Sequence, residues 1–128
     1  MGGEMVEFPV NGSQARGYLV VPDDVSPGVM VIQEWWGLAP QIKGVCDQLA
    51  AEGFVALAPD LYHGELAGHT EMDKAGELMS TLPPDRAARD MSGAIDHLLA
   101  HEATTGQAVG VVGFCMGGML TLVIAAQE

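Results

Sequence analysis

The sequence predicts a three-layer α/β sandwich, in which helices cover both faces of a mostly parallel sheet. Three short apolar runs, at residues 29–33, 54–58 and 109–114, have the composition of strands buried on both faces. They alternate with segments whose apolar residues repeat at helical spacing. The 128 residues are a typical length for one domain, so we treat residues 1–128 as a single domain.

The sheet is expected to begin with an antiparallel pair of strands at residues 6–10 and 17–21. Between them lies Asn11-Gly12, a dipeptide favoured in turns that need a positive φ. A loop rich in Pro, Asp and Ser leads into the first buried strand. The first helix should cover residues 41–52, because Gly53 stands where helices often end in the left-handed conformation.

The second half of the chain alternates in the same way. Residues 61–84 form a long irregular stretch that contains one weak helix at about 72–80. Pro84 begins a helix that runs to about residue 101. After the third buried strand, residues 117–127 are predicted as an apolar helix lying under the sheet.

Composition excludes several classes of function. Lys and Arg number 5 against 17 Asp and Glu, and a net charge of −12 argues against nucleic-acid or anionic-membrane partners. No apolar run approaches the ~20 residues that span a bilayer. The first residues do not resemble a secretory signal, so a cytoplasmic location is expected, with both cysteines as free thiols.

The chemistry is expected at the carboxyl ends of the parallel strands, where ligands bind in such sheets. The strongest motif is Gly-Phe-Cys-Met-Gly-Gly at residues 113–118, a G-x-nucleophile-x-G pattern between a strand and a helix. Cys115 is therefore the candidate nucleophile, and the Met116 N–H is the natural first oxyanion donor. The alternative is that Cys115 is a small buried apolar residue in a glycine-rich turn.

Three segments resemble the dienelactone hydrolase family, a group of α/β-hydrolases with a cysteine nucleophile. They are Val-Ile-Gln-Glu-Trp-Trp-Gly at residues 31–37, Ala-Pro-Asp-Leu-Tyr at 58–62, and the motif at 113–118. The resemblance implies an α/β-hydrolase sheet and a carboxylesterase-like activity on a small-molecule ester or lactone, through a thioester. No cofactor and no metal are expected.

The resemblance also implies roles for residues at the strand ends. Glu34 matches the family glutamate that contacts the thiol, and the Trp35 N–H matches the second oxyanion donor. Trp36, Tyr62 and His63 are the expected pocket residues. No basic residue stands at positions 60–65, where the family has an arginine for a substrate carboxylate, so a neutral or differently shaped ester is the open option.

The family's triad Asp and His follow the nucleophile, and residues 116–128 contain neither. We therefore expect a sheet truncated after the nucleophile turn and its helix, and an isolated chain with little or no turnover. His97 and His101 are predicted as exposed helix residues directed away from the carboxyl edge, whereas His63 lies on the correct edge.

Two other functions remain open. The chain could be a non-catalytic N-terminal piece whose open sheet edge is covered by a second chain or another copy in a homo-oligomer. Alternatively, Cys115 could serve a thiol redox or sensing role. Cys46 lies on the buried face of its helix and is expected to be structural.

Overall fold

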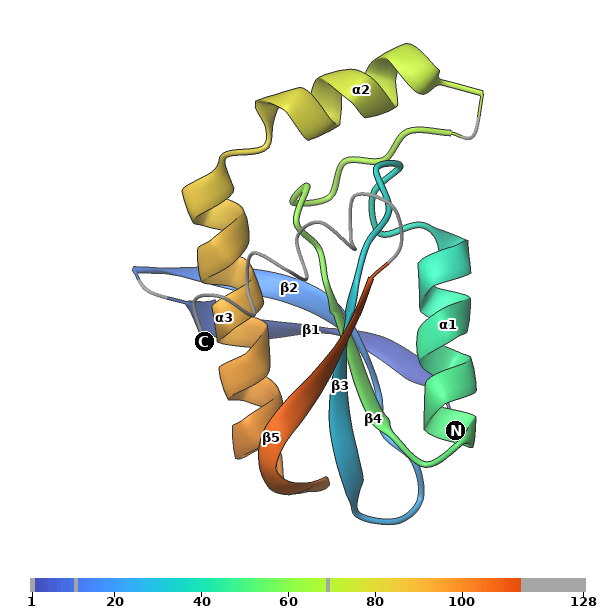
Figure 1. Ribbon diagram of the computed structural model, residues 1–128, viewed down its shortest axis with the longest axis vertical. Helices are drawn as coiled ribbons and strands as arrows, with labels where there is room; N and C mark the ends of the chain where they lie inside the picture. Colours follow the sequence, from blue (N-terminus) through green and yellow to red (C-terminus); the bar gives the residue numbers. More distant parts are fainter. Residues whose placement is uncertain (1, 11, 69, 114–128) are drawn as a thin grey trace.

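The computed structural model describes residues 2–10, 12–68 and 70–113 (Figure 1). Within them the chain forms five strands and three helices. In chain order these are β1 (Gly3–Val10), β2 (Ser13–Val20), β3 (Ser26–Ile32), α1 (Pro40–Ala51), β4 (Val55–Pro59), α2 (Met72–Thr81), α3 (Pro84–Ala100) and β5 (Thr104–Gly113).

The five strands make one sheet in the order β1-β2-β4-β3-β5. β1 and β2 form the expected antiparallel pair, and β2 also runs antiparallel to β4. β3 is parallel to both of its neighbours, β4 and β5. The carboxyl ends of β3, β4 and β5 therefore meet at one edge of the sheet, where Ile32 pairs with Gly113.

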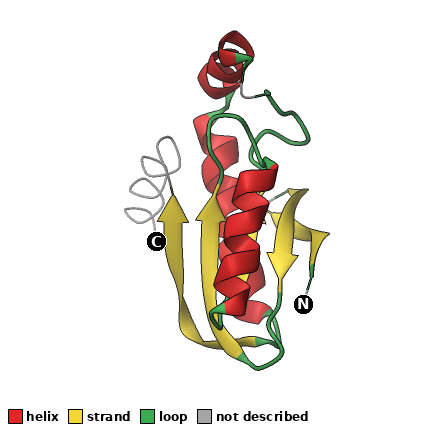
Figure 2. Cartoon of the chain, turned by 90° about the vertical axis from the view of Figure 1, so that its right-hand side faces the viewer, coloured by secondary structure: helices red, strands yellow, loops and turns green. Residues whose placement is uncertain are grey.

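The two long helices lie on opposite faces of the sheet, α1 on one and α3 on the other (Figures 1 and 2). Each face has its own apolar core. The α3 side includes Met91, Ala94 and Leu98, and the α1 side includes Ile42 and Cys46. The strands β3 and β4 are buried almost throughout because helices cover both of their faces. This arrangement confirms the predicted three-layer α/β sandwich.

Most predicted elements are present within a few residues of their expected ends, including the weak helix, which is α2. Gly53 has a φ of 92° and follows α1, as expected for a residue that ends a helix. The prediction was wrong about the start of β5, which begins at Thr104 rather than at 109. The predicted helix at 117–127 lies outside the described residues.

The helix α2 lies beyond the carboxyl ends of the strands, at the top of Figure 1. It is joined to β4 by the loop that follows Pro59, and only Ala75 of this helix is fully buried. No helix in the described part of the chain is both long enough and apolar enough to cross a membrane.

Candidate functional site

The carboxyl ends of β3 and β4 are joined by a buried side chain. Gln33, directly after β3, is fully buried, and its Oε1 accepts a hydrogen bond from the Leu61 N–H at 2.9 Å. The Gln33 Nε2 is also buried and has no hydrogen-bond partner among the described residues. The two loops that carry the predicted site residues therefore start from a fixed position relative to one another.

The loop after β3 makes a tight turn over Glu34–Gly37. The Gly37 N–H donates to the Glu34 carbonyl oxygen at 3.0 Å, and Gly37 has a φ of 105°. A Cβ at this position would lie 2.8 Å from the Glu65 carbonyl oxygen and 3.3 Å from the Tyr62 ring. Only glycine suits both the left-handed backbone and this close approach of the second loop.

Aromatic side chains stand on both of these loops. The rings of Trp35 and Trp36 are both half-buried, with centroids 5.0 Å apart and planes tilted by 59°. The Trp36 carbonyl oxygen accepts the Ala67 N–H at 2.9 Å, which closes the second loop over the first. Tyr62 is buried, and this burial raises the pKa of its hydroxyl to about 12. Tyr62 is therefore neutral at physiological pH.

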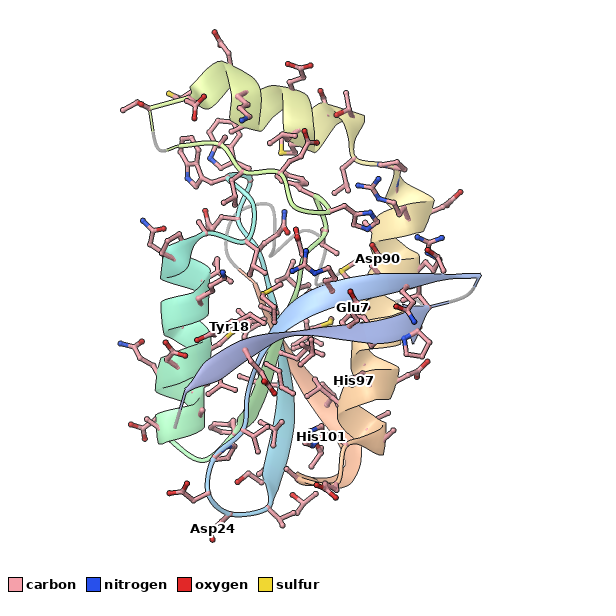
Figure 3. The ribbon with its side chains drawn as sticks, turned by 180° about the vertical axis from the view of Figure 1, so that it is seen from behind. Glu7, Tyr18, Asp24, Asp90, His97 and His101 are labelled. Carbon is pink, nitrogen blue, oxygen red and sulfur yellow. The ribbon has the colours of Figure 1, made fainter. Side chains whose placement is uncertain are left out.

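His63 turns toward the helix α3 and contacts an acidic side chain there. Its Nε2 lies 2.6 Å from Asp90 Oδ2, and the two side chains are 36% and 1% exposed. Figure 3 labels Asp90 on α3, nearer to the carboxyl edge than His97 and His101. A nearly inaccessible carboxylate thus faces an imidazole that solvent can reach.

Two arginines from the first turns of α3 lie close to this His63–Asp90 pair. Arg86 donates through one terminal nitrogen to the Leu61 carbonyl oxygen at 3.0 Å. Arg89 approaches the other oxygen of Asp90, Oδ1, at 3.4 Å. The helix α3 thus brings two guanidinium groups to the end of β4, where each contacts a protein oxygen.

The structure thus places Tyr62 against Gly37, in the turn that also carries Glu34, Trp35 and Trp36. His63 lies on the same edge but contacts α3. Cys115 and Met116 lie outside the described residues. No group of three or more potential metal ligands occurs in the part of the chain that the structure describes.

The prediction that His97 and His101 are exposed was wrong, although both lie away from the carboxyl edge (Figure 3). Both are half-buried. The His97 ring packs against Phe8 at 5.4 Å, and His101 Nδ1 accepts the Ala103 N–H at 3.1 Å. The contact of His97 with Phe8 on the edge strand β1 is long-range, and helical periodicity does not reveal it.

Comparison with known proteins agrees with this architecture. Residues 15–128 match the model of the dienelactone hydrolase family. The chain belongs to that family. It is 43% identical to the protein named usf of Aquifex pyrophilus over 131 aligned positions, which cover 98% of this chain and 56% of that protein. It is 41% identical to a "Putative carboxymethylenebutenolidase" of Aquifex aeolicus, with the same coverage of each chain.

A solved structure named m3DLH superimposes with a TM-score of 0.83 at 28% identity, covering 98% of this chain and 54% of its own. The chain therefore spans about half the length of the relatives it matches. These matches support the α/β-hydrolase form of the sheet, which the resemblance in three short segments had predicted.

Sequence reasoning missed Gln33, Arg86 and Asp90. One signal for Asp90 was present: an acidic residue stands within the apolar face of α3, next to Met91 and three residues after Ala87. Charged residues in such positions are rarely buried unless they are paired. No comparable signal marks Gln33, which directly follows an apolar strand.

Proposed function

We propose that the protein is a hydrolase that cleaves an ester or lactone, with Cys115 as nucleophile and a thioester intermediate. The observation that carries the proposal is the end of β5 at Gly113, paired with Ile32. The nucleophile motif therefore begins at the edge where Glu34 follows β3 by two residues. Membership in the dienelactone hydrolase family supports the same reaction class.

In the proposed reaction the thiol of Cys115 gives its proton to a carboxylate, and Glu34 is the candidate acceptor. The sulfur then bonds to the carbonyl carbon, and the oxyanion is held by the Met116 and Trp35 N–H groups. Collapse of this intermediate breaks the C–O bond, the leaving oxygen takes the proton held by Glu34, and a thioester remains. Water attacks the thioester, the C–S bond breaks, and the acid is released with the thiol restored.

The proposed substrate is a small ester or lactone that fits against Trp36, Tyr62 and His63. Tyr62 is neutral, and its ring supplies apolar surface together with the Trp rings. A neutral ester agrees with the lack of a basic residue at positions 60–65. A cytoplasmic setting, which keeps the thiol reduced, belongs to the same proposal.

The test is the pre-steady-state hydrolysis of p-nitrophenyl acetate. A cysteine nucleophile gives a burst of p-nitrophenolate equal to one acetyl group per chain, followed by slow turnover. We expect Cys115→Ala to abolish the burst, Cys46→Ala to retain it, and Glu34→Gln to slow it at least tenfold. A burst of equal size in Cys115→Ala would contradict the proposal. The absence of any burst in the wild-type chain would instead favour the alternative, in which this chain is a piece whose site a second chain completes.

A further inference from the structure

A small hollow opens at the end of β4, on the side of β2. Its volume is about 150 Å³, and its walls are Gln14, Ala15, Arg16, Asp60 and His63. β2 runs antiparallel to β4 with Gly17 paired to Pro59, so the residues before Gly17 extend past the end of β4. The hollow thus lies beside the loop that carries His63 and is bordered by neither Trp35 nor Trp36.

His63 is held in an unfavourable backbone conformation. Its φ is 51°, and it is the one residue other than glycine with a positive φ in the described ranges. Backbone strain of this kind persists where neighbouring contacts enforce it, and it is often found at functional sites.

The contacts that enforce it lie on both sides of His63. Before it, the Leu61 N–H and carbonyl oxygen bond to the side chains of Gln33 and Arg86. After it, the Gly64 N–H donates to Asp60 Oδ2 at 2.7 Å. The position of the imidazole is therefore fixed by elements on three sides: β3, α3 and the end of β4.

The contact with Asp90 assigns the proton on the ring. A carboxylate only accepts hydrogen bonds, so Nε2, which faces Asp90 Oδ2 at 2.6 Å, carries the hydrogen. In this tautomer Nδ1 carries the lone pair. Asp90 is 1% exposed at its side chain and has Arg89 on its other oxygen, whereas the His63 side chain is 36% exposed. The arrangement has an inaccessible orienting acid and an accessible proton acceptor.

We propose that His63 is a general base for a water or small alcohol held in this hollow, with Asp90 as its positioning residue. The O–H bond of the ligand breaks, the proton moves to Nδ1, and the electron pair stays on the oxygen. The imidazolium is stabilised by the Asp90 carboxylate. With a small activated ester present, that oxygen bonds to the acyl carbon, and the leaving group departs with its electron pair and takes the proton.

This activity uses neither Cys115 nor the residues after it, so it does not rest on the function proposed above. A hollow of about 150 Å³ suits a short acyl group such as acetyl. The two sites are separable by experiment, since one forms a thioester and the other forms no covalent intermediate.

The first test determines which nitrogen of the His63 imidazole carries the hydrogen. Long-range ¹H–¹⁵N correlation spectra of the histidine-labelled 128-residue chain report which ring nitrogen carries hydrogen. We expect His63 in the Nε2–H form, a mixture of forms in Asp90→Asn, and no change in Asp96→Asn, a matched exposed aspartate on the same helix. A wild-type His63 in the Nδ1–H form, or equal spectra in the two variants, would overturn the proposal.

The second test uses p-nitrophenyl acetate with the Cys115→Ala chain, which removes the thiol reaction. We expect steady hydrolysis above the buffer rate without a burst, a loss of at least tenfold in this excess on adding His63→Gln, and no loss on adding His97→Gln. Asp90→Asn should shift the pH at which the hydrolysis rate above buffer is half its maximum. If Asp90 had only a structural role, this pH would not change. Equal rates in the His63→Gln and His97→Gln chains, or no excess over buffer, would overturn the proposal.

Discussion

The side chain of Gln33 accepts a hydrogen bond from the Leu61 N–H at 2.9 Å and so ties the end of β3 to the end of β4. Both residues are fully buried, and they are separated by 28 positions in the sequence. The loop after β3 carries Glu34, and the loop after β4 carries Tyr62 and His63. This one contact therefore sets how the two halves of the candidate site face each other.

We predict that Gln33→Met destabilises the fold by about 1–3 kcal/mol, because the change keeps the volume but leaves the buried Leu61 N–H without an acceptor. Urea denaturation of the variant measures this loss. The control is Gln48→Met on the exposed face of α1, for which we expect a change within about 0.5 kcal/mol. Equal stability of the two variants would show that the Gln33 contact contributes nothing.

Gly37→Ala is expected to destabilise the fold by about 1–3 kcal/mol. The residue has a φ of 105°, and a new Cβ would lie 2.8 Å from the Glu65 carbonyl oxygen, a backbone atom that cannot move alone. Gly44→Ala is the matched control: it lies in α1 with nothing within 4 Å of its Cβ position, so it should stabilise by about 0.5–1 kcal/mol. Thermal unfolding of both variants gives the comparison, and a neutral Gly37→Ala would contradict the described packing of the two loops.

The pH dependence of the free energy of unfolding should come in part from His97. Burial, and then repulsion from His101, lower the pKa of His97 from its ordinary 6.5. Between the lowered value and about 6.5 the unfolded chain binds more protons, so the free energy of unfolding rises with pH through this window and is flat above it. Urea titrations at a series of pH values should show a smaller rise in His97→Gln. An identical slope in both proteins would contradict this.

The two cysteines should differ sharply in reactivity. Burial, followed by the charge of Asp47, raises the pKa of Cys46 to about 12, and its side chain is fully buried. With 5,5′-dithiobis(2-nitrobenzoate) near neutral pH, we expect rapid labelling of Cys115 alone in the native chain and of both thiols in urea. Peptide mapping identifies the labelled residue. Fast labelling of Cys46 in the native chain would be inconsistent with its burial between α1 and the sheet.

The sequence was sufficient to predict the layers of the fold because its strands are apolar runs and its helices have one apolar face. The start of β5 was missed at Thr104, since Thr104, Thr105 and Gly106 look like a loop locally. Thr104 and Thr105 form strand because they pair with Ser26 and Pro27, before a register shift at Gly28. Such pairing with a distant strand overrides local preference.

For the candidate site, the sequence predicted the correct edge and the residues that follow each strand, but not which side chains meet. The pairs His63–Asp90 and Arg86–Leu61 are separated by 27 and 25 positions, and they form only because α3 packs beside the end of β4. Their geometry depends on helix placement, which residue patterns do not specify.

The role of Cys115 as nucleophile can be tested by mass spectrometry of the chain quenched in acid shortly after it is mixed with p-nitrophenyl acetate. A cysteine hydrolase predicts one added acetyl group, mapped to the peptide that contains Cys115 and lost again on longer incubation. The Cys115→Ala chain should carry none. Acetyl groups found only on lysines or on Cys46, with Cys115 unmodified, would contradict the assignment of Cys115 as nucleophile.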